Sequence, residues 1–182
     1  RLGYGDAVED FRLGQFRRAM ALLADVMVNQ VRYRVGALLA LEQVRQSETL
    51  EDGRVLFLKN SALPWTTVVR KEMPKVLFVI SHSITEQRHI LHTVPASPES
   101  FAARADLPEA WAGLRDAELA AVTGVPDAIF CHNGRFIAAA KSFDSVRTMA
   151  RQALQAVDDA AAPVKAGEPE SAADDALEQP KL

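Results

Sequence analysis

The sequence predicts an α/β (α+β) domain in which a long N-terminal helix packs on a mixed, largely antiparallel sheet and further helices cover that sheet. Three observations support this fold class: apolar residues at helical spacing near the N-terminus, a continuous apolar run at 76–81 followed by a strand-like segment at 87–94, and an Asn-Gly dipeptide between two later apolar runs. Apolar residues every three or four positions indicate a helix, whereas a buried strand is a short apolar run.

Segment 11–46 is predicted to form one long amphipathic helix. It contains no proline, and its apolar stripe comprises Met20, Leu23, Met27, Val31, Val35 and Leu38. At 1.5 Å per residue such a helix is roughly 50 Å long, which is unusual for a small domain. A helix of this length often connects two domains or contacts a partner.

Four short strands are expected between residues 54 and 94, at 54–59, 66–70, 76–81 and 87–94. Segment 66–70 is rich in β-branched residues, which favour strands, and Met73-Pro74 ends it. The continuously apolar segment 76–81 is the expected central strand, with 87–94 as its antiparallel neighbour. Segment 95–113 holds three prolines and is expected to be an ordered, irregular crossover.

The C-terminal part predicts a helix at 115–122 capped by Gly124, a hairpin, and a last helix to about 157. The hairpin strands are 128–132 and 135–140. Asn133-Gly134 between them favours a type I′ turn, because both residues tolerate positive φ. Ser142 can cap the last helix.

The composition indicates a globular body with an acidic tail. Of the 182 residues 48% are hydrophobic and 25% charged, and the net charge is −3. Before Asp158 the chain carries 19 basic and 17 acidic residues, so strong non-specific binding to a nucleic-acid duplex is not predicted. We expect a leader at 1–10, a domain at 11–160 that begins with linker helix 11–46, and a disordered acidic tail at 161–182.

The chain shows no signal for membrane insertion or disulfide bonding. No run of about eighteen apolar residues is present, so no transmembrane helix or membrane partner is expected. A single cysteine, Cys131, excludes an intramolecular disulfide and a Cys-rich zinc site. A cytoplasmic setting is therefore expected.

Three of the four histidines, His82, His89 and His92, lie within eleven residues and raise the question of a metal site. On a strand, residues three apart point to opposite faces, so His89 and His92 cannot chelate one ion. Adjacent strand residues also point to opposite faces, so His132 cannot readily act as a base toward a Cys131 nucleophile. We therefore expect no catalytic residue and no metal ligand in this chain.

The most informative segment for binding is 132–142. It combines the Asn133-Gly134 turn, the cation Arg135, a run of alanines, and Lys141-Ser142 at a helix start. Small residues permit close approach to the backbone, and the N-terminal amides of a helix favour an anion such as phosphate. An ordinary hairpin followed by an ordinary helix cap explains the same residues equally well.

Further candidates have two interpretations each. Arg115 is either a phosphate or carboxylate ligand or an ordinary residue at a helix start. Trp65 and Trp111 could stack a base, but their Pro and Leu neighbours favour buried corners. Phe136 is likewise expected in the core.

Several blocks of the sequence resemble the C-terminal part of the melanocyte-proliferating-gene (Myg) family of metal-dependent protein hydrolases, which is allied to the DHH phosphoesterase superfamily. The resemblance covers about residues 11–155, and its most specific block is Leu107-Pro108-Glu109-Ala110-Trp111-Ala112-Gly113-Leu114-Arg115-Asp116. Further blocks are Phe16-Arg17-Arg18-Ala19-Met20, Leu63-Pro64-Trp65, Phe78-Val79-Ile80, His92-Thr93-Val94-Pro95, Ile129-Phe130-Cys131-His132 and Gly134-Arg135-Phe136-Ile137.

The resemblance implies a metal-dependent nuclease in which an N-terminal DHH-type domain binds manganese and a C-terminal domain binds a phosphate-containing substrate, RNA or a nucleotide. Family members are associated with 3′–5′ RNA exonuclease activity. This chain shows no Asp-His-His or His-x-Asp pattern, so it is expected to be the substrate-binding part and inactive alone. Where the family often has Gly-Gly, it has Ala138-Ala139.

Two further expectations concern partners. The chain is expected to bind the missing N-terminal domain, and a homo-oligomer is a possible state. From a different functional class, the alternative is a non-catalytic interaction module that docks through the long helix.

Overall fold

The computed structural model of the chain describes residues 4–97 and 102–162. Along the chain the elements are α1 (Tyr4–Arg45), β1 (Thr49–Leu50), β2 (Val55–Leu58), α2 (Trp65–Glu72), β3 (Phe78–Ser83), β4 (Arg88–Thr93), the short 3-10 helix η1 (Glu109–Trp111), α3 (Asp116–Thr123), β5 (Ala128–Cys131), β6 (Ile137–Ala140) and α4 (Phe143–Ala161). The expected α+β class is confirmed.

Six strands form one sheet in the order β1-β2-β3-β4-β6-β5. Only β2 and β3 pair in parallel, and the other neighbours are antiparallel. The sheet is therefore mixed and largely antiparallel, as expected. The central strand β3 and its antiparallel neighbour β4 are those predicted at 76–81 and 87–94.

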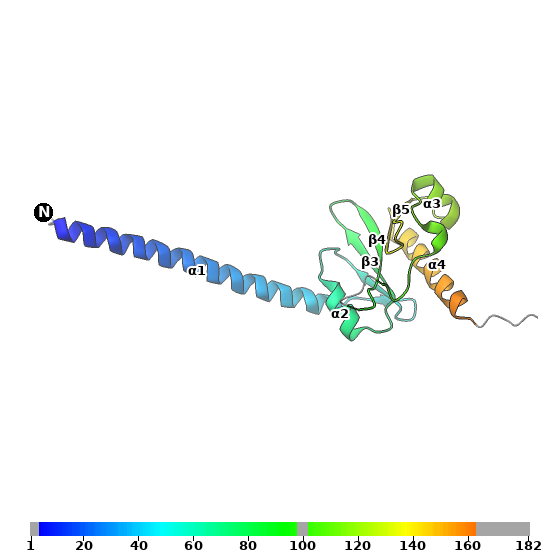
Figure 1. Cartoon of the computed structure of the whole chain (residues 1–182), viewed down its shortest axis with the longest axis horizontal. Coiled ribbons are helices and arrows are strands. Elements are labelled where there is room, and N and C mark those ends of the chain that lie inside the picture. The colour runs from blue at the N-terminus through cyan, green and yellow to red at the C-terminus, as the bar shows by residue number, and fades with distance from the viewer. Residues whose placement is uncertain (1–3, 98–101, 163–182) are drawn as a thin grey trace, which may run out of the picture.

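The two faces of the sheet carry cores of different size. One face packs on α4 and α3 through the larger core, which includes Phe78, Leu91 and Met149. The other face packs on α2 and the end of α1 through a smaller core, which includes Val44 and Val69. Figure 1 shows α2 beside one end of the body and α4 along another side. The smaller core covers β2 and β3 but leaves the β4–β6 side of this face partly open.

Helix α1 projects away from the body along most of its length (Figure 1). It is longer than the predicted helix 11–46, and its only fully buried residue is Val44, in the last turn. The expectation that the long helix packs on the sheet therefore holds only for its C-terminal end. There Arg45 forms an ion pair with Glu72 of α2, with Nε and Oε2 2.8 Å apart.

Residues 66–70 form part of a helix, α2, so their predicted strand is wrong. Val68 and Val69 are both buried in the smaller core, whereas consecutive residues of a regular strand point to opposite faces. Pro64 precedes the helix with φ −79°, a value that suits a helix start. Packing of these valines on Val44 and the sheet outweighs the β-propensity of β-branched residues.

The C-terminal helices follow the sequence closely. Gly124 ends α3 with φ +67°, and the Ser142 hydroxyl oxygen accepts a hydrogen bond from the Ser145 N–H at 3.2 Å to cap α4. Val146, Met149 and Ala153 form the buried face of α4. The predicted acidic tail lies almost wholly outside the described residues. Within them, no helix has the length and apolar character to cross a membrane.

Candidate functional site

The β5–β6 hairpin turns at His132–Arg135, but it lacks the predicted type I′ geometry. The Arg135 N–H donates to the His132 carbonyl at 2.8 Å. Positive φ occurs at Arg135 (55°) and at neither Asn133 nor Gly134. The loop is thus a β-turn followed by a left-handed residue, a common three-residue hairpin connection, and the type I′ prediction is wrong.

Gly134 is favoured by close packing rather than by its backbone angles. A Cβ at this position would lie 3.1 Å from Phe136 Cδ1 and 3.3 Å from His132 Nδ1. The Gly134 N–H donates to His132 Nδ1 at 2.9 Å, and the rings of His132 and Phe136 lie with centroids 4.3 Å apart. The absence of a side chain therefore lets the turn contact both rings.

The segment 107–114 lies against this hairpin. The Leu107 N–H donates to the Arg135 carbonyl at 3.0 Å, and the Cys131 N–H donates to the Leu114 carbonyl at 2.9 Å. Gly113, with φ +76°, faces the Asn133 side chain, whose Oδ1 lies 3.6 Å from the position of an added Cβ. Two separate blocks that carry the family resemblance are therefore in contact.

The two arginines predicted to bind phosphate have protein partners. Arg135 pairs with Asp106, with Nη2 and Oδ2 3.3 Å apart. The Arg115 guanidinium lies 5.7 Å from the Phe130 ring centroid, and the Arg88 guanidinium lies 5.4 Å from the same centroid. Arg115 remains exposed, so it can reach a ligand without losing a buried contact.

Lys141 and Ser142 lie at the other end of β6, where Asp127 occupies the start of α4. The Ser142 N–H donates to Asp127 Oδ2 at 2.9 Å, and the Lys141 N–H donates to the Asp127 carbonyl at 3.1 Å. Burial raises the pKa of this carboxyl, but hydrogen bonding with Ser145 and Ser142 outweighs burial and holds the pKa below its ordinary value. The chain therefore supplies its own anion to this helix end.

The predicted site residues consequently form two groups rather than one. Asn133, Gly134 and Arg135 lie at the turn, and Arg115 lies next to β5, with which it forms a β-bridge at Phe130. Lys141 and Ser142 follow β6, and six residues of extended chain separate positions 135 and 141 by roughly 20 Å. The alanines between the two groups, Ala138–Ala140, are fully buried strand residues, so they do not form an open loop.

A cavity of about 600 Å³ opens at the turn end of β6, on the face that α2 covers only in part. Its lining combines three rings with small and polar residues: Trp65, Thr66, His92, Thr93, Pro95, Ala103, Asp106, Gly134 and Phe136. Phe136 is 47% exposed, so the expectation that it lies in the core is wrong. Trp65 is half-buried at this wall, whereas Trp111 is 3% exposed within the larger core.

His92 contributes an uncharged polar group to the cavity wall. Burial lowers its pKa from 6.5 to about 4, so the imidazole is neutral near pH 7. A hydrogen bond of 3.2 Å joins His92 Nε2 to the Ser81 hydroxyl, and the Trp65 and His92 ring centroids are 5.7 Å apart. Nδ1 is the imidazole nitrogen that this bond leaves available to a ligand.

The remaining histidines and the cysteine follow the predicted strand parity. His89 lies on the α4 face of the sheet, where its ring stacks on that of His82 with centroids 4.7 Å apart. His92 lies on the opposite face. Cys131 is buried, and burial raises the pKa of its thiol to about 11. Within residues 4–97 and 102–162, no three His, Cys, Asp or Glu side chains are grouped to hold a metal. The manganese implied by the resemblance therefore has no fitting site among them.

Sequence reasoning missed the cavity and the Asp127 cap. Trp65, His92 and Phe136 come from α2, β4 and the end of the hairpin loop, which are far apart in the sequence. The sequence feature that could have indicated the cavity is the turn glycine Gly134, which is followed two residues later by the aromatic residue Phe136. Asp127 precedes Ser142 by fifteen residues, and no local pattern links the two.

The sequence of the chain matches a family model and proteins of animals and fungi. The family model MYG1_exonuc, described as an uncharacterised protein family (UPF0160), matches residues 6–154. Human MYG1 exonuclease is 27% identical over 150 residues, which cover 76% of this chain and 40% of the human protein. Mouse MYG1 exonuclease is 30% identical over 151 residues, which cover 76% of this chain and 40% of the mouse protein. A MYG1 protein of Saccharomyces cerevisiae is 40% identical over 86 residues, 47% of this chain and 24% of the yeast protein.

No solved structure matches the chain. The chain spans about two fifths of the length of the human and mouse relatives. The family model nevertheless covers most of the chain, including α1, the cavity and both ends of β6. The chain therefore belongs to the MYG1 exonuclease family.

Proposed function

We propose that this chain is the substrate-binding part of an exonuclease-like, metal-dependent phosphoesterase, and that the cavity beside Phe136 receives a base of RNA or of a nucleotide. The observation that carries the proposal is an open cavity walled by Trp65 and by Phe136, an aromatic ring that is 47% exposed. Aromatic rings at a surface stack bases of any sequence, at about 1–3 kcal/mol per base. The relatives named exonucleases support a ligand with a free chain end.

The polar lining supports recognition of a planar heterocycle. Neutral His92, the Thr66 hydroxyl and the Asp106 carboxylate lie around the same cavity as the two rings, and bases present both donors and acceptors at their edges. Arg135, paired with Asp106, is the cation closest in sequence to Gly134 at the cavity wall. We propose that Arg135, with the Asn133-Gly134 turn and exposed Arg115, contacts the phosphate of the bound nucleotide. Phosphate binding by Lys141 and Ser142 stays a separate prediction.

Catalysis by a metal-dependent phosphoesterase requires metal ligands, and no three His, Cys, Asp or Glu side chains are grouped to hold a metal among residues 4–97 and 102–162. Hydrolysis of a phosphodiester by a metal enzyme needs ions that polarise the phosphoryl oxygens and generate hydroxide. We propose that the manganese ligands belong to a DHH-type domain outside this chain, that the chain contacts that domain, and that it is inactive alone. A cytoplasmic setting remains part of this proposal.

The proposal is tested with a short single-stranded RNA that carries a fluorophore at its 5′ end. Fluorescence anisotropy should detect binding to the purified chain, weakened at least five-fold by Phe136→Ala, because a stacking contact is lost. Tyr33→Ala is the matched control, since it removes an exposed aromatic side chain of α1 and should leave affinity unchanged.

Two outcomes would overturn the proposal. Equal affinity of the wild type and Phe136→Ala would remove the cavity from RNA binding. Release of nucleotides from the RNA by the chain with Mn²⁺ alone would show that it carries its own metal site.

A second function, an interaction module that docks through α1, is favoured by a different observation. The helix exposes apolar side chains along its whole projecting length. That surface is independent of the cavity, and the two functions are compatible in one protein.

A further inference from the structure

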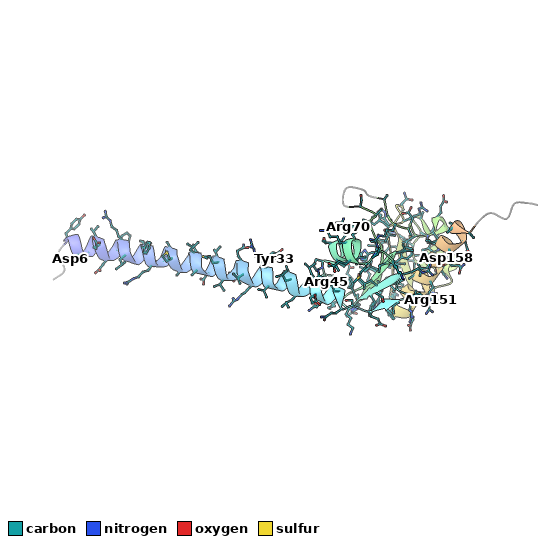
Figure 2. All side chains as sticks on the ribbon, turned by 90° about the horizontal axis from the view of Figure 1, so that it is seen from below. Asp6, Tyr33, Arg45, Arg70, Arg151 and Asp158 are labelled. Carbon is teal, nitrogen blue, oxygen red and sulfur yellow. The ribbon has the colours of Figure 1, made fainter. Side chains whose placement is uncertain are left out.

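The projecting part of α1, residues 4–39, has almost no contact with the rest of the molecule. All of these residues except Val8 are exposed, and the helix first joins a core at Leu41 and Val44. Figure 2 shows Asp6 and Tyr33 on this segment well away from the body, with Arg45 where the helix meets it. The segment includes large apolar side chains that expose half or more of their surface, such as Phe16 (62%), Met20 (50%), Leu23 (52%) and Met27 (62%).

An isolated helix of this kind lacks the contacts that normally stabilise helices. Most helical stability in proteins comes from packing of an apolar face. Contiguous apolar surface of this extent marks an interaction site. The question is which partner matches the pattern along the helix.

One seam of the helix repeats with the heptad spacing of a coiled coil. Its positions are 9, 13, 16, 20, 23, 27, 30 and 34, occupied by Glu9, Leu13, Phe16, Met20, Leu23, Met27, Gln30 and Arg34. Alternating steps of four and three keep such a seam on one side of a helix pair. The seam positions are arranged symmetrically about the midpoint between residues 21 and 22.

The charges on this seam distinguish the two possible directions of a helix pair. Glu9 and Arg34 are the only charged residues in the seam, and they lie at equal distances from its midpoint. In an antiparallel pair of identical helices, Glu9 of each copy faces Arg34 of the other, which gives two opposite-charge contacts. A parallel pair places Glu9 beside Glu9 and Arg34 beside Arg34, and also Arg12 beside Arg17 across the flanking positions.

We propose that α1 pairs with α1 of a second copy of this chain in an antiparallel two-helix coiled coil. The register places Met20 opposite Leu23 and Phe16 opposite Met27, and it aligns residue 4 with residue 39. The two helices then overlap along the whole length of the exposed stretch. The pair rests on α1 alone and is independent of the proposed function of the cavity.

The available area suffices for a stable dimer. If the eight large apolar side chains at the seam and its flanking positions (Leu13, Phe16, Met20, Leu23, Val26, Met27, Val31 and Tyr33) each hide roughly 80 Å², about 640 Å² per copy is buried, which reaches the lower end of the size range of specific interfaces. Charges at seam positions lower the stability of a coiled coil but specify its register and direction. Charge complementarity and area therefore both favour a second copy as the partner.

The first test is sedimentation equilibrium of the full chain at micromolar concentrations. We expect a dimer for the wild type and a monomer for Met20→Lys with Leu23→Lys, because two cations would then face two cations. Circular dichroism verifies that the body of the variant remains folded. A wild type that is monomeric at 100 µM would overturn the proposal, as would a variant that dimerises like the wild type.

A charge exchange tests the direction of the pair. Glu9→Arg alone and Arg34→Glu alone each place like charges opposite each other twice and should weaken dimerisation at least several-fold. The double variant Glu9→Arg with Arg34→Glu restores opposite charges only in the antiparallel register, so it should recover the wild-type dissociation constant. Single variants that dimerise like the wild type, or a double variant no better than the single ones, would contradict the antiparallel register.

Discussion

The two ends of strand β6 carry similar sequence signals for binding but differ in what surrounds them. The turn end has a glycine, Arg135 and a partly exposed aromatic ring, all beside a cavity of about 600 Å³. The helix end has Lys141, Ser142 and the free amides of a helix start, but Asp127 already occupies it. A helix N-terminus favours anions in general. Here the anion is a side chain of the protein, so the structure favours the turn end for an external ligand.

The largest expected effect concerns His92, in the wall of the turn-end cavity. Its folded pKa of about 4 lies below the ordinary 6.5, so the unfolded state binds a proton in this interval that the folded state rejects. The resulting stability is present above pH 6.5 and is lost as pH falls, by up to about 3 kcal/mol at pH 4.

Denaturant unfolding at several pH values measures this contribution. His92→Gln cannot titrate, so the difference in unfolding free energy between wild type and variant should change by about 2 kcal/mol between pH 7 and pH 5. A difference that stays constant with pH would mean that His92 is not desolvated and that the wall is open to water.

The next effect should come from Asp127→Ala, which removes the anion from the helix end. Loss of the cap should lower the unfolding free energy by about 1–2 kcal/mol. Because the pKa of Asp127 is lowered, its contribution is present above its ordinary pKa and disappears as pH falls below it. The same change should raise the affinity of the helix end for phosphate, measured by titration calorimetry. If neither the unfolding free energy nor the phosphate affinity changed, Asp127 would not occupy the helix end, and the contrast between the two ends of β6 would be lost.

A smaller effect is expected from Gly134→Ala at the turn end. The new Cβ would lie 3.1 Å from Phe136 Cδ1, so the ring must move by a few tenths of an ångström. The backbone of Gly134 has no positive φ, so stability should change by less than about 1 kcal/mol. Nucleotide affinity should fall about three-fold, as measured by the change in tryptophan fluorescence on titration. An increase in affinity would mean that Phe136 obstructs the cavity rather than lines it.

The smallest effect should come from Lys141→Ala at the helix end. The Lys141 side chain is exposed and has no ion pair within the described part of the chain. If the base lies roughly 20 Å away at the turn end, RNA affinity in 150 mM salt should fall by less than about two-fold. A ten-fold loss would bring Lys141 back as a principal ligand.

The sequence predicted most of the elements because their signals are local. A continuous apolar run identified β3, segment 87–94 was predicted correctly as its antiparallel neighbour β4, and Gly124 and Ser142 marked a helix end and a helix start correctly. Residues 66–70 were misassigned because the contact of Val68 and Val69 with Val44 is between distant segments. The projection of α1 was missed for a related reason, since an apolar stripe shows that a partner exists but not which one.

The candidate site was less predictable than the fold. Sequence proximity of Arg135 and Lys141 suggested one site, but the intervening strand Ile137–Ala140 places them at its opposite ends. The expectation of a core position for Phe136 failed because the sheet face beside β6 is only partly covered by α2. Such features depend on which elements meet in space, and no pattern in 132–142 encodes them.

The central claim is that a nucleotide binds at the turn end of β6 and not at the start of α4. Titration of the full ¹⁵N-labelled chain with a mononucleotide, followed by NMR, tests it most directly. We predict shifts of the Trp65 indole N–H and of the amides of His92, Gly134 and Phe136, with residues 141–145 unchanged. Shifts confined to residues 141–145, with the Trp65 indole unmoved, would contradict the claim.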